Sequence, residues 1–448
     1  MITQVNHMSH IDEASRKAVI SNRIYIKYTP ELYEQCKKEL YYKIPAKVPG
    51  QKPQIITSLK MLGERTLMLP VGRQDLIPKG YSIVDNRTLV PVEFPEFKFE
   101  LREDQQAIYE QVEDNCLINA NPSWGKTFTG IAIATKLKQK TIVVVHTLAL
   151  KKQWEDEVRK TLGIEPGVIT AGTFNIDSPI VIANIQTLRN RLQEVKKEFG
   201  LVIVDEVHHT PASTFEVTLN MFSARYKIGL SATLERKDFR HVVIPDYFSK
   251  KVYVAPKNNQ KDPSITIIDS GIELNSNPMI PWATRVNMLT QKPSYLKLIT
   301  GIAGKAAEMG HKVLVVSDRT EFLEQCYRIH KDISTLVIGT VKEGSRDEAH
   351  ELILHDPNIR ILYGAISIYK EGISLNCLSA LVPAAPINNE PLLKQLIGRI
   401  ERIEEGKLDP VVFDIKLAGA TGKKQALART RYYMKMGYKV KVVKMTKN

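Results

Sequence analysis

The sequence lacks several features that would assign it to common protein classes. Its 4 cysteines, Cys36, Cys116, Cys326 and Cys377, stand far apart, so neither a disulfide framework nor a paired zinc motif is indicated. No apolar run of about 18 residues or more occurs, which argues against a membrane-spanning helix. The first residues carry acids and histidines where a signal peptide requires an apolar segment. We therefore expect a cytoplasmic protein with reduced thiols and no membrane partner.

Acidic residues are scarce relative to basic ones. Lys and Arg number 63 against 49 Asp and Glu, which gives a formal net charge of +14. Such an excess points to a polyanionic partner, because neutralisation of phosphates by basic side chains dominates nucleic-acid affinity. Residues 423–448 contain no acid at all. This stretch is either a nucleic-acid-binding segment or the solvated, amphipathic end of a folded domain.

The pattern of apolar runs predicts an α/β fold. A chain of 448 residues is too long for one core, and from about residue 100 to 420 short β-branched runs alternate with longer helical patterns. This alternation is typical of parallel sheets with crossover helices, here in two halves. We expect strands at residues 116–120, 141–147, 179–185, 201–206 and 226–233, and in the second half at 312–318, 334–339, 360–366, 380–386 and 410–415.

Shifts in composition suggest where the domains begin and end. Pro- and Gly-punctuated short strands near the N-terminus indicate a small mixed domain without legible chemistry, and residues 257–282 are rich in Asn, Asp, Ser and Pro, as in a linker with one strand. The expected parts are an accessory domain (1–95), a first α/β domain (96–255), a linker (256–294), a second α/β domain (295–420) and a basic C-terminal segment (421–448).

The segment INANPSWGKTFTG, residues 118–130, resembles a phosphate-binding loop. Gly125, Lys126 and Thr127 end it as such a loop ends, although Ala120 replaces its usual first glycine. A strand pattern precedes the segment and a helical pattern follows it, so backbone N–H groups and the helix dipole can meet phosphates. Lys126 would bridge the β- and γ-phosphates of ATP, and Thr127 would ligate Mg²⁺. The alternative is a chance Gly-Lys-Thr in a turn.

An acidic pair and an arginine pair complete a candidate hydrolytic site. Asp205 and Glu206 follow the apolar run LVIV; Asp205 would hold Mg²⁺ and Glu206 would act as general base toward water, whereas alone the pair would be a helix N-cap. In QLIGRIER, Arg399 and Arg402 stand at i and i+3, which predicts one helix face in the second α/β half. They would stabilise charge on the γ-phosphate, or would form salt bridges with neighbouring glutamates.

These segments in this order resemble the superfamily 2 helicases, and in detail the phage branch-migration helicases and their relatives RecG and XPB. The resemblance covers about residues 97–420 and implies two RecA-like parallel-sheet domains that form a helicase core. It implies further roles by position. ATP contacts fall on Arg102, Gln105, Ala120, Ser123 and Gly372; coupling of hydrolysis to domain movement falls on His208, Ser231, Thr233 and Gln395; DNA contacts fall on Thr147, Gln186, Thr187, Ser317, Arg319 and Thr320.

Some of these assignments have a plain structural alternative. Singly, Gln105, Thr147, Ser231 or Thr233 would be a cap or a turn residue, and only the ordered ensemble favours function. The motif around Gly372 also departs from the family pattern, because Ala365 or Ile366 and Ser374 occupy positions where a small hydroxyl and an acid are usual.

The resemblance implies an ATP- and Mg²⁺-dependent DNA helicase or translocase. It would act, as a monomer, on branched substrates such as forks and four-way junctions, in replication, recombination or repair, alongside proteins of those processes and within a phage-infected bacterium. Three alternatives stay open: an RNA helicase, a duplex translocase that does not separate strands, and a nucleotide-switched binding protein.

Overall fold

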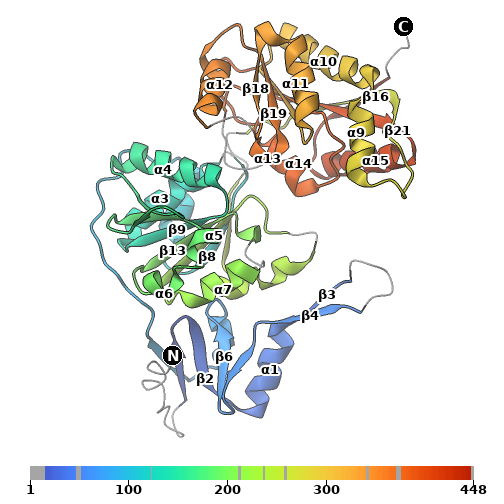
Figure 1. Cartoon of the computed structure of the whole chain (residues 1–448). Coiled ribbons are helices and arrows are strands. Elements are labelled where there is room, and N and C mark those ends of the chain that lie inside the picture. The colour runs from blue at the N-terminus through green and yellow to red at the C-terminus, as the bar shows by residue number, and fades with distance from the viewer. Residues whose placement is uncertain are drawn as a thin grey trace. The chain divides into compact units, whose positions relative to one another are not determined.

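The computed structural model describes residues 16–46, 52–122, 124–209, 213–235, 238–256, 260–339, 343–369 and 375–444. The chain divides into two compact units, Met1–Pro256 and Lys257–Asn448. Figure 1 shows their elements, with the first unit in blue to green and the second in yellow to red. None of the helices in the described part of the chain combines the length and apolar character that a bilayer crossing requires.

A small domain opens the first unit and has its own core. Its main sheet has the order β5-β6-β2-β1-β7, and β3 and β4 pair separately as an antiparallel ribbon. Helix α1 begins after Thr29, whose hydroxyl accepts a hydrogen bond from the Leu32 amide, and Pro30 takes the first helical position. Leu32 and Leu40 of α1 are buried against this sheet's apolar face. The elements are β1 (Lys17–Ile20), β2 (Arg23–Lys27), α1 (Pro30–Leu40), β3 (Tyr41–Ile44), β4 (Gln54–Thr57), β5 (Lys60–Leu62), β6 (Thr66–Pro70), η1 (Gln74–Leu76) and β7 (Ser82–Asp85).

The rest of the first unit is an α/β domain built on a mainly parallel sheet. The strand order is β11-β10-β12-β9-β13-β14-β8-β15, in which the β10–β11 pair is antiparallel. The five strands expected here are confirmed. The elements are α2 (Glu103–Gln111), β8 (Cys116–Asn119), α3 (Lys126–Leu137), β9 (Thr141–Val145), α4 (Leu148–Leu162), β10 (Gly167–Ile169), β11 (Phe174–Asn175), β12 (Ile180–Asn184), α5 (Ile185–Leu188), α6 (Leu192–Val195), β13 (Leu201–Asp205), η2 (Val207–His209), α7 (Ser213–Met221), β14 (Tyr226–Ser231), η3 (Arg240–Val243), α8 (Ile244–Tyr247) and β15 (Val252–Val254).

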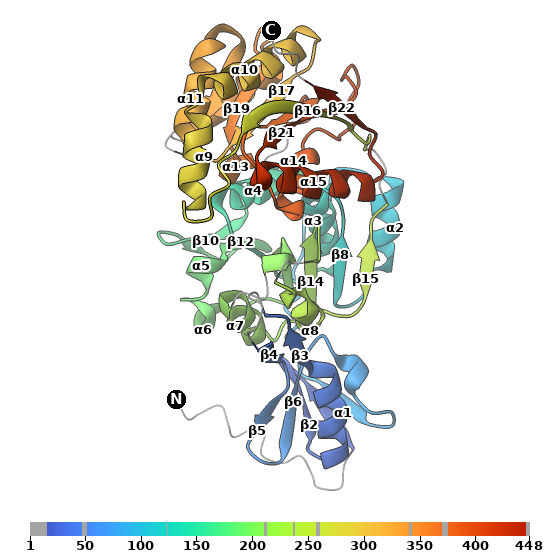
Figure 2. The ribbon, with the colours of Figure 1, turned by 90° about the vertical axis from the view of Figure 1, so that its right-hand side faces the viewer.

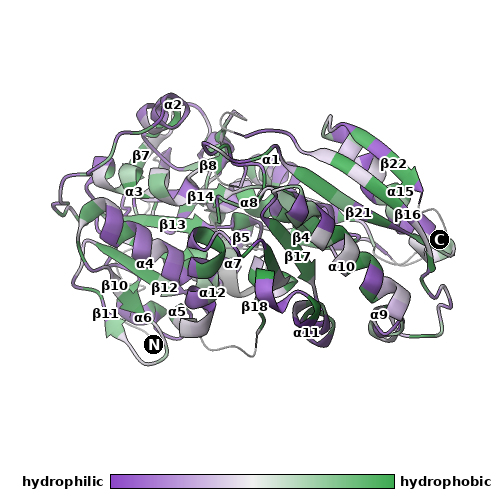
Figure 3. Cartoon of the chain, turned by 90° about the horizontal axis from the view of Figure 1, so that it is seen from above, coloured by the Kyte–Doolittle hydropathy of each residue, from purple (hydrophilic) through white to green (hydrophobic). Residues whose placement is uncertain are grey.

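The central strands of this sheet are apolar on both faces because helices cover both sides. Every residue of β9, β12 and β13 is buried, as expected for parallel strands. Helix α4 instead alternates apolar and polar residues, which is visible as alternating colours in Figure 3. It begins at the Thr147 cap and ends at Gly163, whose φ of +69° suits a left-handed C-cap. The polar strand ends therefore collect at one edge of the sheet.

The second unit is another α/β domain. Its sheet has the order β18-β19-β17-β20-β21-β16-β22, and its strand pairs are parallel. The five strands expected in this half are also confirmed. The elements are β16 (Ser264–Glu273), α9 (Trp282–Thr290), α10 (Pro293–Glu308), β17 (Val313–Ser317), α11 (Thr320–Ile329), η4 (Lys331–Ile333), β18 (Ser334–Val337), α12 (Glu343–His355), β19 (Ile361–Ala365), α13 (Ile366–Tyr369), β20 (Ala380–Pro383), α14 (Glu390–Ile397), β21 (Val411–Ala418), α15 (Ala420–Lys435) and β22 (Val440–Lys444).

Two expectations about this half need correction. From residue 260 onward, the interval expected as a linker (256–294) belongs to the second domain. The one strand expected there, β16, pairs with β21 and β22 inside the sheet, and α9 packs onto α10. Its polar composition misled because β16 carries polar residues over its exposed C-terminal part. The basic C-terminal segment expected after this domain (421–448) lies inside it over its described part, since α15 and β22 belong to the second domain. This agrees with the alternative that the stretch is the amphipathic end of a folded domain. Arg429 of α15 forms a buried ion pair with Asp414 of β21, at 2.7 Å.

Candidate active site

The phosphate-binding loop joins β8 to α3. Gly125 caps α3 with φ +95°, and a Cβ there would lie 2.6 Å from the Nε2 atom of Gln105. The positive φ favours glycine, and a Cβ would also require the Gln105 side chain to move. Lys126 begins the helix, and its Nζ donates to the Ala120 carbonyl at 3.2 Å. The strand, loop and helix therefore have the arrangement that presents backbone N–H groups to an anion.

Residues at the start of helix α2 hold this loop by hydrogen bonds. Arg102 Nη2 and Gln105 Nε2 donate to the Trp124 carbonyl at 2.6 and 2.9 Å, and the Trp124 indole donates to Asp104 Oδ2 at 2.6 Å. Trp124 is 2% exposed and belongs to the core. The ATP contacts of Arg102 and Gln105 stay predictions, whereas their hydrogen bonds to the loop are direct.

Asp205 ends β13 in a buried position. Its Oδ2 accepts a 2.9 Å hydrogen bond from the Trp154 indole, and its Oδ1 accepts one from the Glu206 amide at 2.9 Å. Burial raises the pKa of the Asp205 carboxyl to about 6, and the neighbouring Glu206 charge adds to this, while Lys126 and the Trp154 hydrogen bond act in the opposite direction. The Lys126 ammonium is thus close enough to favour the Asp205 carboxylate.

Glu206 joins a polar network with the coupling residues. The Ser231 hydroxyl lies 3.3 Å from Glu206 Oε2 and donates to the Thr233 carbonyl at 2.6 Å. His208 Nδ1 lies 3.2 Å from the same Glu206 oxygen and 3.1 Å from Ser231 Oγ. Glu206 also has a φ of +53°, a strained value for a residue other than glycine. The fold therefore brings together the predicted base and three of the four predicted coupling residues.

The oxygen ligands present suit a magnesium ion. Thr127 contributes a hydroxyl, which accepts from Gln153 Nε2 at 2.9 Å, and Asp205 contributes a carboxylate. Mg²⁺ prefers such hard oxygen donors and usually binds few protein groups together with substrate phosphates. Thr127 and Asp205 are therefore the residues that would hold it.

The predicted nucleic-acid contacts of the first unit lie at one sheet edge. Thr147 follows β9 and caps α4, accepting from the Leu150 amide at 3.2 Å. Gln186 and Thr187 follow β12 in the short helix α5, and Gln186 is exposed. Because β9 and β12 are parallel neighbours, these residues share the edge formed by the strands' C-terminal ends.

In the second unit, the predicted DNA contacts lie at the end of β17. Ser317 is buried and its hydroxyl accepts from the Arg319 amide at 3.1 Å. Arg319 caps α11, and Thr320 is the first residue of that helix. Gln395, the fourth predicted coupling residue, lies buried in α14.

The predicted arginine pair does not lie on a helix face. Helix α14 ends at Ile397. The amides of Arg399 and Ile400 bond to carbonyls three residues back, so the helix tightens and stops before Arg399. Arg399 Nε donates to the Tyr369 carbonyl at 3.1 Å, and Arg402 Nη1 bonds to Asn376. Ile400 beyond the helix is buried in the core, which fixes this turn. The two arginines thus share a loop.

Two predicted ATP contacts, Ser123 and Gly372, lie outside the described residues. No site role was predicted from the sequence for three positioning residues: Gln153 beside Thr127, Asp104 beside Trp124, and Trp154 beside Asp205. Gln153 and Trp154 are neighbours in α4, and the helical period places them over the loop and the β13 end. The available signal was their position in the segment HTLALKKQW (146–154), which contains the predicted DNA contact Thr147.

Comparisons with known proteins show which proteins this chain resembles. The family model described as "Type III restriction enzyme, res subunit" matches residues 98–236. The protein named "Probable helicase D10" of Escherichia phage T5 is 43% identical over 430 residues, covering 94% of this chain and 95% of that protein. The protein named "DNA 3'-5' translocase XPB2" of Sulfurisphaera tokodaii is 24% identical over 357 residues, covering 68% of this chain and 79% of that one.

Two solved structures share the fold. A yeast Dbp5 variant bound to RNA and ADP BeF3 has a TM-score of 0.57 at 11% identity, covering 76% of this chain and 89% of that one. The ATP-dependent Type ISP restriction-modification enzyme LlaBIII bound to DNA has a TM-score of 0.56 at 15% identity, covering 78% of this chain and 32% of that one. These likenesses confirm two RecA-like α/β domains.

Proposed function

The chain belongs to the superfamily 2 helicases, and on that premise we propose that it hydrolyses ATP to move along DNA and to remodel branched duplexes such as forks and four-way junctions. The observation that carries the motor is the hydrogen-bonded group of Glu206, His208, Ser231 and Thr233. It joins the candidate base Glu206 to the end of β14, so a change at the base on hydrolysis would be transmitted to that strand. DNA as the substrate is supported by the name of the archaeal relative.

The chain's own residues divide the chemistry among themselves. Lys126 and the backbone amides at the start of α3 bind the phosphates, and Glu206 takes the proton of the attacking water. When bound, Mg²⁺ neutralises phosphate charge. Arg399 and Arg402 stabilise charge that develops on the γ-phosphate. Thr147, Gln186, Thr187, Arg319 and Thr320 contact the nucleic-acid backbone, so binding is salt-dependent and weakly sequence-specific.

The N-terminal domain and the exposed basic face of α15 and β22 hold duplex arms in this proposal. The support is charge. Lys424, Arg431, Lys435, Lys439 and Lys441 are exposed, and the sequence from residue 423 onward contains no acid to neutralise them.

The decisive experiment is the steady-state ATPase rate with no nucleic acid, single-stranded DNA, linear duplex, a fork, a four-way junction and matched RNA. We expect the strongest stimulation by forks and junctions, abolished in Lys126→Ala. Glu206→Gln should bind ATP and DNA normally but not hydrolyse; unchanged hydrolysis would remove Glu206 from its role.

The second candidate is an RNA helicase. A mimivirus relative, 27% identical over 340 residues and covering 70% of this chain and 63% of that protein, carries that name. Stronger stimulation of the ATPase by RNA than by every DNA would move the assignment there.

A further inference from the structure

The ribbon formed by β3 and β4 has two faces of different character. Register pairs Tyr42 with Ile56 and Lys43 with Ile55, so side chains alternate between the faces. Tyr42 and Ile56 pack against the apolar core of the first α/β domain. On the other face Lys43 and Ile55 are exposed, Ile55 by 62%, together with Tyr41. One face is therefore docked and the other is open to a partner.

The docked face is held by polar contacts to the segment that follows the coupling residues. The Tyr42 hydroxyl lies 3.0 Å from both carboxylate oxygens of Asp246, and Arg240 Nη2 donates to Gln54 Oε1 at 2.9 Å. Arg240 and Asp246 belong to η3 and α8, which come next in the chain after Ser231 and Thr233. Figure 2 shows β3 and β4 beside α8. The ribbon is thus fixed to η3 and α8, the elements that follow the coupling residues Ser231 and Thr233 in the chain.

The backbone at Gly72 lies so close to the backbone of α8 that any residue larger than glycine would not fit. The Gly72 amide donates to the Asp246 carbonyl at 3.0 Å, and a Cβ on Gly72 would lie 2.1 Å from the Pro245 carbonyl oxygen. The Arg73 guanidinium, 3% exposed, lies 3.6 Å from Asp246 and 2.8 Å from Glu39. Gly72 and Arg73 follow β6, so these contacts fix the small domain on α8. The ribbon, which would be marginal in isolation, is held by the bonds of Tyr42 to Asp246 and of Gln54 to Arg240.

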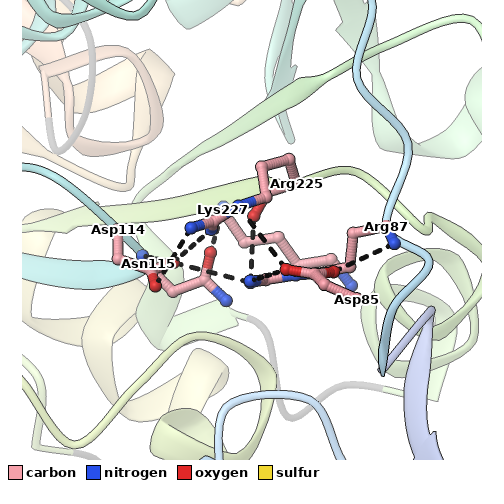
Figure 4. Close-up of polar contacts among 6 residues, drawn as sticks. All are labelled: Asp85, Arg87, Asp114, Asn115, Arg225 and Lys227. Carbon is pink, nitrogen blue, oxygen red and sulfur yellow. Dashed lines mark hydrogen bonds and ion pairs between the residues drawn. The ribbon is translucent and has the colours of Figure 1, made fainter. Parts of the chain in front are cut away.

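A second polar cluster ties the same small domain to the motor. Figure 4 shows Arg87 between Asp85 of β7 and Asp114 before β8, with Arg225 bound to the same Asp114. Arg87 donates to Asp85 Oδ2 at 2.6 Å, and Arg225 to Asp114 Oδ1 at 2.7 Å. With anchors at two separate places, the small domain and the first motor domain are joined as one body.

The open face has the chemistry of a nucleic-acid contact. Lys43 is exposed on β3, Lys52 is exposed just before β4, and Lys38 lies at the adjoining end of α1. Tyr41 has the Lys37 ammonium 5.9 Å from its ring centre. Lysines beside an exposed aromatic and an aliphatic side chain fit a phosphate backbone with its sugars, and the net charge of +14 fits the same partner.

We propose that the outer face of the β3–β4 ribbon, with Tyr41, Lys43 and Ile55, contacts the duplex arm of the substrate, and that the dock on Arg240 and Asp246 fixes it relative to the motor. The inference rests on the proposed function. It names the residues of the N-terminal domain that contact the duplex, and the residues of the first α/β domain that anchor them.

The test compares Lys43→Glu/Ile55→Ser with a matched control, Lys79→Glu/Ile83→Ser, whose residues are exposed before and within β7. Duplex affinity is measured without ATP, and fork unwinding and the single-strand-stimulated ATPase are measured with it. We expect the ribbon variant to lose duplex affinity at least about fivefold, as a charge reversal at a phosphate contact should. It should lose most fork unwinding while keeping its ATPase, and the control should match wild type.

Duplex affinity and unwinding equal to wild type in the ribbon variant would overturn the contact. A chain without DNA-stimulated ATPase would overturn the proposed function instead, and the affinity comparison would still decide the ribbon. Tyr42→Phe tests the dock, because it removes the hydroxyl bound to Asp246. This variant should keep its duplex affinity and unwind less DNA per ATP hydrolysed. Wild-type unwinding would show that the Tyr42–Asp246 contact does not anchor the ribbon.

Discussion

Trp154 Nε1 lies 2.9 Å from Asp205 Oδ2 and donates a hydrogen bond to it, with both side chains buried. This bond connects α4 to the end of β13. Because burial disfavours the charged carboxylate, each donor directed at Asp205 helps to keep it available for a cation. Helix α4 thus positions the acid from its buried side, while its cap residue Thr147 lies at the sheet edge.

Trp154→Phe should weaken magnesium-dependent hydrolysis while the fold is retained. Phenylalanine fills most of the volume but leaves the carboxylate short of one donor, and hydrogen bonds to charged groups contribute roughly 1.5–3 kcal/mol. We expect a raised Mg²⁺ requirement and about a tenfold or greater loss of ATPase rate at low Mg²⁺. A Mg²⁺ titration of the rate measures this. Trp124→Phe, which leaves Asp205 untouched, is the control and should not change the Mg²⁺ requirement.

Gly125→Ala should abolish ATP binding. The positive φ and the close Gln105 side chain together disfavour any Cβ, at a cost of roughly 1–3 kcal/mol that the loop would avoid by distorting. Equilibrium binding of a fluorescent ATP analogue checks the outcome. Gly172→Ala is the control, since its Cβ would meet nothing within 4 Å. Wild-type affinity in Gly125→Ala would contradict the loop geometry.

Lys227 should make the first unit more stable as the pH rises above neutrality. It is fully buried in β14, donates to the Leu219 carbonyl at 2.9 Å, and lies near Arg87 (Figure 4). Burial lowers the pKa of Lys227 to about 7, and the Arg23 and Arg87 charges act in the same direction. Between that value and its ordinary value near 10.5 the unfolded chain binds more protons, so the free energy of unfolding increases with pH.

Lys227→Met should flatten this dependence. Urea unfolding at a series of pH values from about 6.5 to about 9 measures it, and we expect the wild-type slope to fall markedly in the variant. The exposed Lys197→Met should keep the slope. An identical slope in wild type and Lys227→Met would show that the lysine stays charged in the fold.

Charge reversal on α15 should weaken DNA binding without unfolding the second domain. Lys424 and Lys435 are exposed, and removal of each phosphate contact should reduce the salt slope of binding by about 0.9. Lys424→Glu/Lys435→Glu should bind DNA several-fold more weakly, with a shallower slope. Lys297→Glu/Lys305→Glu on α10 is the matched control.

Deleting residues 423–448 is not an equivalent experiment. It removes Arg429 and leaves Asp414 buried without its guanidinium, which destabilises the fold by roughly 3–5 kcal/mol. Thermal unfolding should therefore report a destabilised second domain in the deletion and a stable one in the charge-reversal variant.

The sequence predicted much of the site because its signals are local. The Gly-Lys-Thr end of the loop, the acidic pair after an apolar run and the Ser231-Thr233 pair each need only a strand and the turn that follows it. The arginine pair shows the limit of such reasoning. Helical spacing was extended past Gly398, where burial of Ile400 and a tightened last turn ended the helix instead.

The sequence by itself determined the ten expected strands, the parallel α/β class and the residues at the strand ends, because buried runs and helical periods are read along a short stretch of chain. Only the tertiary structure decided that β16 and β22 complete the second sheet, that Trp154 serves Asp205 and that Tyr42 anchors a ribbon on Asp246. Each of these joins residues far apart in the chain, and which distant groups meet depends on sheet order and packing rather than on any local pattern.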